Sequence, residues 1–184
     1  MMKTLRLAAV LCLLGGASAW ADGDAAARAM QQHDYASALR EWRPVAEQGD
    51  AAAQYNMGVI HYNGLGIERD IPAAIQWFEK AAAGDNVPAM SLLGALYLSG
   101  QAGKSDPGRT FRLLLDAAKK GDATAQYNVG SLYASGQGVP VNLVQAWVWV
   151  SAAERNGVIE AQELRKTIHA RLGEDDKEHL NRLA

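Results

Sequence analysis

The sequence predicts an all-α fold, an α-solenoid in which antiparallel helix pairs of about 36 residues stack side by side. The first observation is a repeated phrase: AQYNMGVIHYNGLG at residues 53–66 returns as AQYNVGSLYASGQG at residues 125–138. The second is that glycines, alanines and helix-capping residues recur every 36 residues in the same register. Such a period is the signature of a repeat architecture, in which each unit buries its apolar face against its neighbours.

The first 21 residues have the features of a secretory signal peptide. Lys3 and Arg6 precede a short apolar run, and the small residues that follow offer Ala-x-Ala sites ending at Ala19 and Ala21. The run is too short to span a bilayer, which takes about 20 apolar residues. We therefore expect residues 1–21 to be removed on export, which makes the protein periplasmic or secreted.

The composition of the rest excludes several classes of protein. Without Lys3 and Arg6, 16 basic and 20 acidic side chains remain, so the mature chain carries a net charge near −4 and no nucleic-acid partner is expected. Beyond the leader, no apolar stretch is long enough for a transmembrane segment. Cys12, the only cysteine, leaves with the leader, so we expect packing without a disulfide to stabilise the fold.

Residues 22–49 are predicted to form a leading partial repeat. The stretch DYASALREWRPVAEQGD, from Asp34 to Asp50, has the pattern of the second helix of a unit. Pro44 lies inside this pattern. Because proline removes a backbone hydrogen bond, it predicts a kink or an early end of the helix.

Three full units are predicted at residues 50–85, 86–121 and 122–157. Each consists of a first helix of about 13 residues, a glycine-containing turn and a second helix of similar length. Aspartate or asparagine stands before most helices, where its side chain can accept a hydrogen bond from a first-turn N–H. These predicted caps are Asp50, Asp70, Asn86, Asp106 and Asp122, and Asp34 and Asn142 stand in the same repeat column as Asp70 and Asp106.

Glycine also recurs in the middle of each first helix, at Gly58, Gly94 and Gly130. Glycine there costs roughly 1 kcal/mol relative to alanine. Since every unit accepts this cost, the pattern predicts close backbone contact between the two helices of a pair.

These residues strongly resemble the Sel-1-like repeat family, relatives of tetratricopeptide repeats. The matching phrases are AQYNMGVIHYNGLG with PAAIQWFEKAAAG, and AQYNVGSLYASGQG with VQAWVWVSAAERNG. The middle unit departs most: AMSLLGALYLSGQAG lacks Gln-Tyr-Asn and has Ala102 where the other turns have glycine, and Gly108 falls in its second helix. The resemblance implies a non-enzymatic scaffold that mediates protein–protein contacts.

Residues 158–184 are predicted to be C-terminal capping helices. VIEAQELRKTIHARLG reads as a helix that ends at Gly173, and EDDKEHLNRLA begins with acidic residues suited to a helix N-terminus. A solenoid needs such polar units at its ends.

No catalytic motif is present. The chain lacks Ser-x-x-Lys, Gly-x-Ser-x-Gly, His-Glu-x-x-His and phosphate-loop patterns, and its four histidines are scattered, so no enzyme activity, metal or cofactor is expected. The leading interpretation is an exported adaptor that binds a protein or peptide through its solenoid surface. The alternative is a cell-wall glycan binder or hydrolase, related to β-lactams or peptidoglycan.

The tetratricopeptide pattern, carried onto this sequence, implies a set of partner-binding residues on the concave face. In the other interpretation the tyrosines of this set fill gaps between repeats. Tyr55 and Tyr127 can do both, with the ring buried and the hydroxyl presented. The full set is Tyr55, Val59, Tyr62, Asn63, Ser91, Tyr127 and Ser131.

The middle unit, residues 86–121, has five basic and two acidic side chains and is net +3. Lys104, Arg109 and Arg112 are therefore candidates to attract an acidic partner. In the alternative interpretation the unit is a solvated surface on which Arg112 pairs with Asp116 four residues on.

Overall fold

The computed structural model describes residues 20–103 and 106–183, and every regular element within these ranges is an α-helix. Most of the predicted signal peptide and Lys104 lie outside the described residues. The helices are α1 (Trp20–Gln31), α2 (Tyr35–Glu47), α3 (Ala51–Asn63), α4 (Ile71–Ala83), α5 (Val87–Leu98), α6 (Pro107–Lys119), α7 (Ala123–Ser135), α8 (Leu143–Arg155), α9 (Ala161–Arg171) and α10 (Glu174–Leu183).

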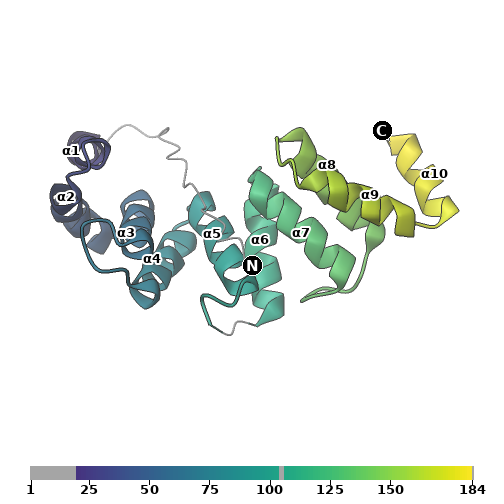
Figure 1. The fold of residues 1–184 in the computed structure, drawn as a ribbon, viewed down its shortest axis with the longest axis horizontal. Helices are drawn as coiled ribbons and strands as arrows, with labels where there is room; N and C mark the ends of the chain where they lie inside the picture. Colours follow the sequence, from purple (N-terminus) through teal and green to yellow (C-terminus); the bar gives the residue numbers. More distant parts are fainter. Residues whose placement is uncertain (1–19, 104–105, 184) are drawn as a thin grey trace, which may run out of the picture.

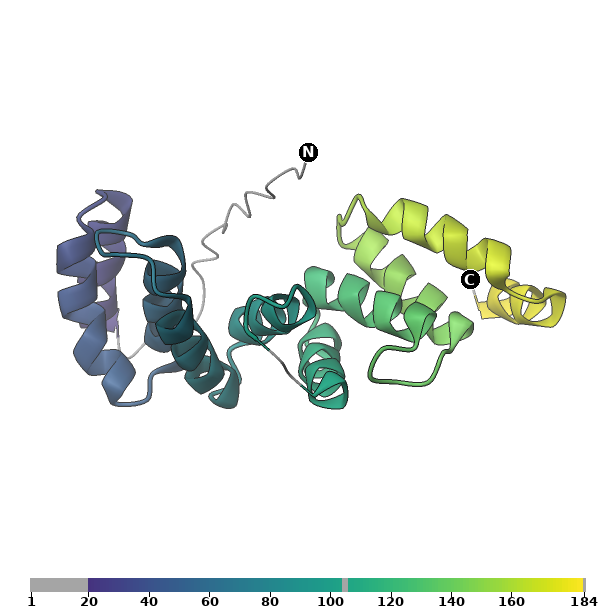
Figure 2. The same cartoon turned by 60° about the horizontal axis from the view of Figure 1, so that its bottom comes forward.

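The helices form a bowed row of antiparallel pairs (Figures 1 and 2). Consecutive helices from α1 to α9 pack against one another, so each pair contacts the next. In addition, α5 contacts α7 and α7 contacts α9, so the first helices of these units follow one another along the same side of the row. The predicted all-α solenoid is confirmed.

The predicted caps form. Asp50 and Asp122 each accept a hydrogen bond of 2.7 Å from the backbone N–H three residues on, and the same type of bond begins α2, α4, α5 and α8. In α6 the side chain of Asp106 accepts from the N–H of Gly108, two residues on. Of the two outcomes predicted at Pro44, a kink or an early end, the early end is wrong, because α2 continues to Glu47. Trp42 and Ala46 on either side of the proline are buried, so the packed face of the helix outweighs the one missing donor.

The mid-helix glycines mark the closest approach within each pair. A methyl group on Gly58 would overlap the ring of Phe78, and one on Gly94 would overlap Leu114. At Gly130 it would meet the side chain of Val150 and the backbone of the same helix, with the Ala146 oxygen at 3.0 Å. The predicted close contact between paired helices is therefore present in all three units.

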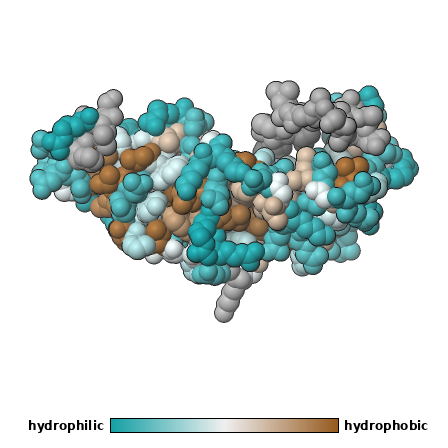
Figure 3. Space-filling model, turned by 180° about the vertical axis from the view of Figure 1, so that it is seen from behind, coloured by the Kyte–Doolittle hydropathy of each residue, from teal (hydrophilic) through white to brown (hydrophobic). Residues whose placement is uncertain are grey.

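The buried core runs along the stack as three clusters, at the leading end, in the middle and at the closing end. Each cluster joins neighbouring pairs, which is how a solenoid without a single central core gains stability. Apolar surface is left in patches separated by polar residues (Figure 3). No helix in the described part of the chain has the length and apolar character needed to cross a membrane.

Candidate functional site

A groove with a volume of about 190 Å³ lies between α3 and α5 and is also lined by residues at the start of α7. It gathers five of the seven residues predicted for the concave face. Its lining is Tyr55, Val59, Tyr62 and Asn63 from α3, Pro88, Ser91, Leu92 and Ala95 from α5, and Asp122 and Thr124 at α7.

Tyr55 contributes both to the core and to the groove. Its ring lies tilted against that of Phe78, with 5.9 Å between the ring centroids, and the side chain is half-buried. Val59, one helical turn on, is buried beneath the groove. Tyr55 therefore packs the repeat and also lines the hollow, and its role in binding a partner stays a prediction.

The polar groups of the groove offer mainly acceptors. Ser91 donates a hydrogen bond of 2.7 Å to Oδ1 of Asp122, which also accepts the capping bond from Ala125. Asn63 uses its Nδ2 to donate to the Val59 carbonyl at 3.0 Å, which leaves its Oδ1 for a ligand. Asp122 is the single charged residue among those that line the groove. The groove is thus suited to a donor or a cation.

Tyr127 and Ser131, the two remaining residues of the predicted set, are not brought to this groove. Both lie on α7 and are half-buried. The Tyr127 ring packs against the closing cluster, which includes Ala146 and Val150. In that unit the tyrosine contributes to the packing of the core.

Three basic side chains of the middle unit, Arg109, Arg112 and Lys120, do not line the groove, and each lies near a carboxylate. Arg109 lies 3.6 Å from Glu79 of the preceding unit, and Lys120 lies 2.9 Å from Asp85. The predicted pairing of Arg112 with Asp116 is wrong, because its nearest carboxylate is that of Asp106, at 3.8 Å. Because helical side chains point toward the N-terminus of their helix, Arg112 reaches Asp106, the N-cap of α6.

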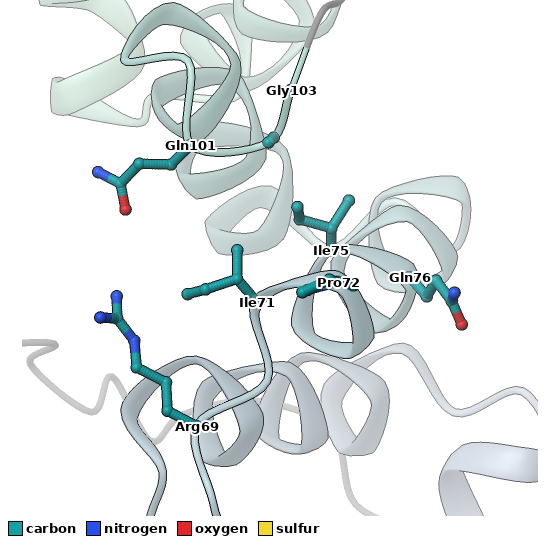
Figure 4. A pocket seen from close by; sticks show the side chains of 8 residues that line it. Arg69, Ile71, Pro72, Ile75, Gln76, Gln101 and Gly103 are labelled. Carbon is teal, nitrogen blue, oxygen red and sulfur yellow. The ribbon is translucent and has the colours of Figure 1, made fainter.

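Sequence reasoning missed a second, larger hollow at the edge of the stack, with a volume of about 670 Å³. We call it the edge pocket; it lies between the start of α4 and the turn after α5 (Figure 4). The signal that pointed to it was Ala102 in a column of turn glycines. The pocket is lined by Arg69, Ile71, Pro72, Ile75, Gln76, Gln101, Ala102 and Gly103.

Neither hollow contains a set of metal ligands. Among the residues that the structure describes, no group of three or more histidine, cysteine, aspartate or glutamate side chains could hold a metal ion. Both hollows are lined by helices or turns of neighbouring repeat units.

The repeat units are matched by a family model. Residues 51–86, 87–122 and 123–158 each match the Sel1 repeat, and together they make up more than half of the chain. The chain belongs to the Sel1 repeat family. It is a Sel1 repeat scaffold, and its units stack as the family resemblance implied.

Solved structures agree with this assignment. A Sel1 repeat protein from Oxalobacter formigenes superposes with a TM-score of 0.63 and 31% sequence identity. The match covers 70% of the present chain and 97% of the Oxalobacter protein. The protein c5321, described as a protective antigen present in uropathogenic Escherichia coli strains and displaying an SLR fold, gives a TM-score of 0.68 and 35% identity. That match covers 77% of the present chain and 30% of c5321.

Among curated proteins, the alginate biosynthesis protein AlgK of Azotobacter vinelandii is 32% identical over 121 residues. This match covers 66% of the present chain but only 26% of AlgK. The chain spans a smaller share still of three other curated relatives that it matches.

Proposed function

We propose that this Sel1 repeat chain is an exported, non-enzymatic adaptor that binds an extended segment of a partner protein in the groove between α3 and α5. The observation that carries the proposal is the gathering of five predicted face residues in one hollow, with aromatic, aliphatic and hydrogen-bonding side chains together. Extended inner surfaces of this kind are what solenoids use for binding.

The chemistry of the lining supports a particular kind of segment. Tyr55, Tyr62 and Leu92 offer apolar surface, while Asn63 and Asp122 offer acceptors. An apolar side chain next to a lysine or arginine satisfies both, because the cation can lie against the Asp122 carboxylate and the apolar group against the tyrosines.

Export is supported by the leader-like residues 1–21. The description of c5321 as a protective antigen is consistent with its export, since exported proteins are accessible to the immune system of the host. Intact-mass analysis of envelope and culture fractions tests this part. A chain that begins at Trp20 or Asp22 is expected, and retention of Met1 in those fractions contradicts it.

The binding proposal is tested by site-specific photocrosslinking in the producing cells. A photoreactive residue at Thr124, which is exposed and lines the groove, is expected to capture a discrete partner. The same residue at exposed Gln145 on α8 is the control and is expected not to capture it. Tyr55→Ala and Asp122→Asn are both expected to weaken capture, and asparagine retains the helix cap.

Equal capture at the two positions, or capture at Thr124 that neither substitution changes, contradicts the groove as the binding site. The Asp122→Asn variant matters here, because Tyr55→Ala also removes packing against Phe78 and can destabilise the repeat.

A further inference from the structure

The edge pocket exists because one turn stands away from the helix beneath it. Residues 66, 102 and 138 occupy one repeat column, and the residues beneath them, at 35, 71 and 107, occupy another. In the first unit, a methyl group on Gly66 would lie 2.7 Å from Cβ of Tyr35. In the third, a methyl group on Gly138 would overlap the Pro107 carbonyl. Only glycine permits these contacts.

The middle unit breaks this column with Ala102, and the residue beneath it is Ile71. A side chain at this position is incompatible with the close approach that the outer turns make. The hollow opens between these two residues, and both line it. Its volume of about 670 Å³ falls in the range of small-ligand sites.

The floor of the edge pocket is apolar and its rim carries one charge. Ile71, Pro72, Ile75 and Ala102 supply the apolar surface, and Arg69 is the single charged residue in the lining. Figure 4 shows Arg69 and Gln101 facing one another across the opening with Ile71 between them, while Gln76 projects away.

Both rim side chains are held in place by Tyr62. Arg69 donates from Nε to the Tyr62 carbonyl at 2.8 Å, and its guanidinium carbon lies 5.1 Å from the centroid of the tyrosine ring. The Tyr62 hydroxyl donates to Oε1 of Gln101 at 3.1 Å. In the described part of the chain, no carboxylate forms an ion pair with Arg69.

This arrangement presents hydrogen-bond donors, rather than acceptors, at the rim of the edge pocket. The terminal nitrogens of Arg69 and the amide NH₂ of Gln101 both donate, because Nε and Oε1 are used within the protein. Two converging donors, one of them cationic, match a carboxylate, and preorientation lowers the entropy lost on binding.

We propose that the edge pocket is a second binding site, beyond the groove between α3 and α5, and that it takes an acidic peptide segment in which an aliphatic or aromatic side chain neighbours a carboxylate. The carboxylate binds Arg69 and Gln101, and the apolar side chain covers Ile71 and Ile75. A peptide fits better than a bare anion, because apolar residues make up half of the lining beside a single cation.

The probe is the blocked pentapeptide Gly-Phe-Glu-Phe-Gly, titrated into the ¹⁵N-labelled exported protein. The backbone amides of Ile71, Ile75, Gln101 and Gly103 are expected to shift, and the counterparts with glutamine or lysine in place of glutamate are expected to bind at least about tenfold more weakly. Shifts confined to other residues, or equal binding of the lysine peptide, overturn the proposal. Hexanoate tests a free fatty acid, and if it binds as tightly as the peptide, the peptide assignment fails.

Substitutions test the rim charge and the space inside the edge pocket separately. Arg69→Gln is expected to weaken the peptide about tenfold and Arg69→Lys less, because lysine keeps the charge without the planar fork. Ile75→Trp copies the residue at the equivalent position 147 and is expected to fill the pocket and abolish binding. Arg112→Gln, on an exposed arginine of the next unit, is the matched control and is expected to have no effect.

The two proposed sites can fail independently. Tyr55 lines the groove but no part of the edge pocket. The substitution Tyr55→Ala is therefore expected to leave pentapeptide binding unchanged. Unchanged binding in Arg69→Gln and Ile75→Trp, with both variants folded by circular dichroism, overturns the edge-pocket site whatever the photocrosslinking at Thr124 shows.

Discussion

The side-chain amide of Gln126 donates a hydrogen bond of 3.3 Å to the backbone carbonyl of Ala118, across the boundary between two repeat units. Gln54 does the same to Ala46 at 3.0 Å. Both glutamines are buried. The glutamine of the repeated phrase AQYN is therefore a link between units, and the middle unit, with Met90 in its place, lacks this link.

The substitution Gln126→Met copies the middle unit into the third. It keeps the side-chain volume but removes the bond to Ala118 and the bond that Asn156 donates to Gln126 at 2.9 Å. We expect the free energy of unfolding to fall by about 1 kcal/mol for each lost bond. Urea denaturation measures it, with Gln162→Met on an exposed position of α9 as the control. An unchanged midpoint contradicts a stabilising role for the link.

The close approach at Gly130 predicts a reversal of the usual preference of helices for alanine. Alanine is favoured over glycine in a helix by about 1 kcal/mol. At position 130 its methyl group would meet the backbone of α8, which cannot move aside, so we expect Gly130→Ala to destabilise the protein by about 1–3 kcal/mol.

The matched control is Gly108→Ala in α6. There the nearest atom to the added methyl group is a terminal nitrogen of Arg112 at 3.5 Å, which is ordinary contact. This substitution is expected to be neutral or stabilising in the same denaturation experiment. If both variants change stability in the same direction, the tight packing of the paired helices is not the reason for glycine at position 130.

Asp85 adopts a left-handed backbone conformation, with φ at 64°. The same column of the repeat holds Gly49, Gly121 and Gly157, which also have positive φ. Since this conformation costs a residue with a Cβ about 1–2 kcal/mol, we expect Asp85→Gly to be more stable than Asp85→Ala by about 1 kcal/mol.

Thermal or urea denaturation of the two variants gives this difference. The ion pair of Asp85 with Lys120 is absent from both, so the comparison isolates the backbone. Lys120→Ala measures the ion pair by itself and is expected to have an effect below about 1 kcal/mol, because both side chains are exposed. Equal stability of the glycine and alanine variants would argue against backbone strain at this position.

Burial lowers the pKa of the His61 imidazole, an effect that Asp70 opposes and Arg43 reinforces. The unfolded chain then takes up a proton at a higher pH than the folded chain does. Stability is therefore expected to fall as the pH drops below the ordinary value of 6.5. His61→Gln is expected to remove part of the difference in unfolding free energy between pH 7.5 and about 5.5, while His169→Gln, at an exposed position, is expected to retain it. A pH dependence identical in His61→Gln and the unaltered protein would contradict this.

The sequence by itself determined the repeat, its register and the close packing within each pair. These features depend on local or periodic constraints: a capping carboxylate such as Asp50 bonds an N–H three residues away, and a glycine such as Gly58 faces its own partner helix. Five of the seven concave-face residues line one groove for the same reason, because their positions follow from the helical period and the repeat length. Their placement in one hollow could therefore be predicted, while their role in binding stays a prediction.

What only the tertiary structure decided depends on how one unit sits on the next. The sequence contains Ala102, Ile71 and Arg69, but a hollow forms among them because the turn cannot reach the helix of the preceding unit. Likewise, the pairing of Arg109 with Glu79 and the bond of Tyr62 to Gln101 join side chains of neighbouring units. Their distances are set by the rotation between repeats, and that rotation arises from the packing of many side chains at once rather than from any local pattern.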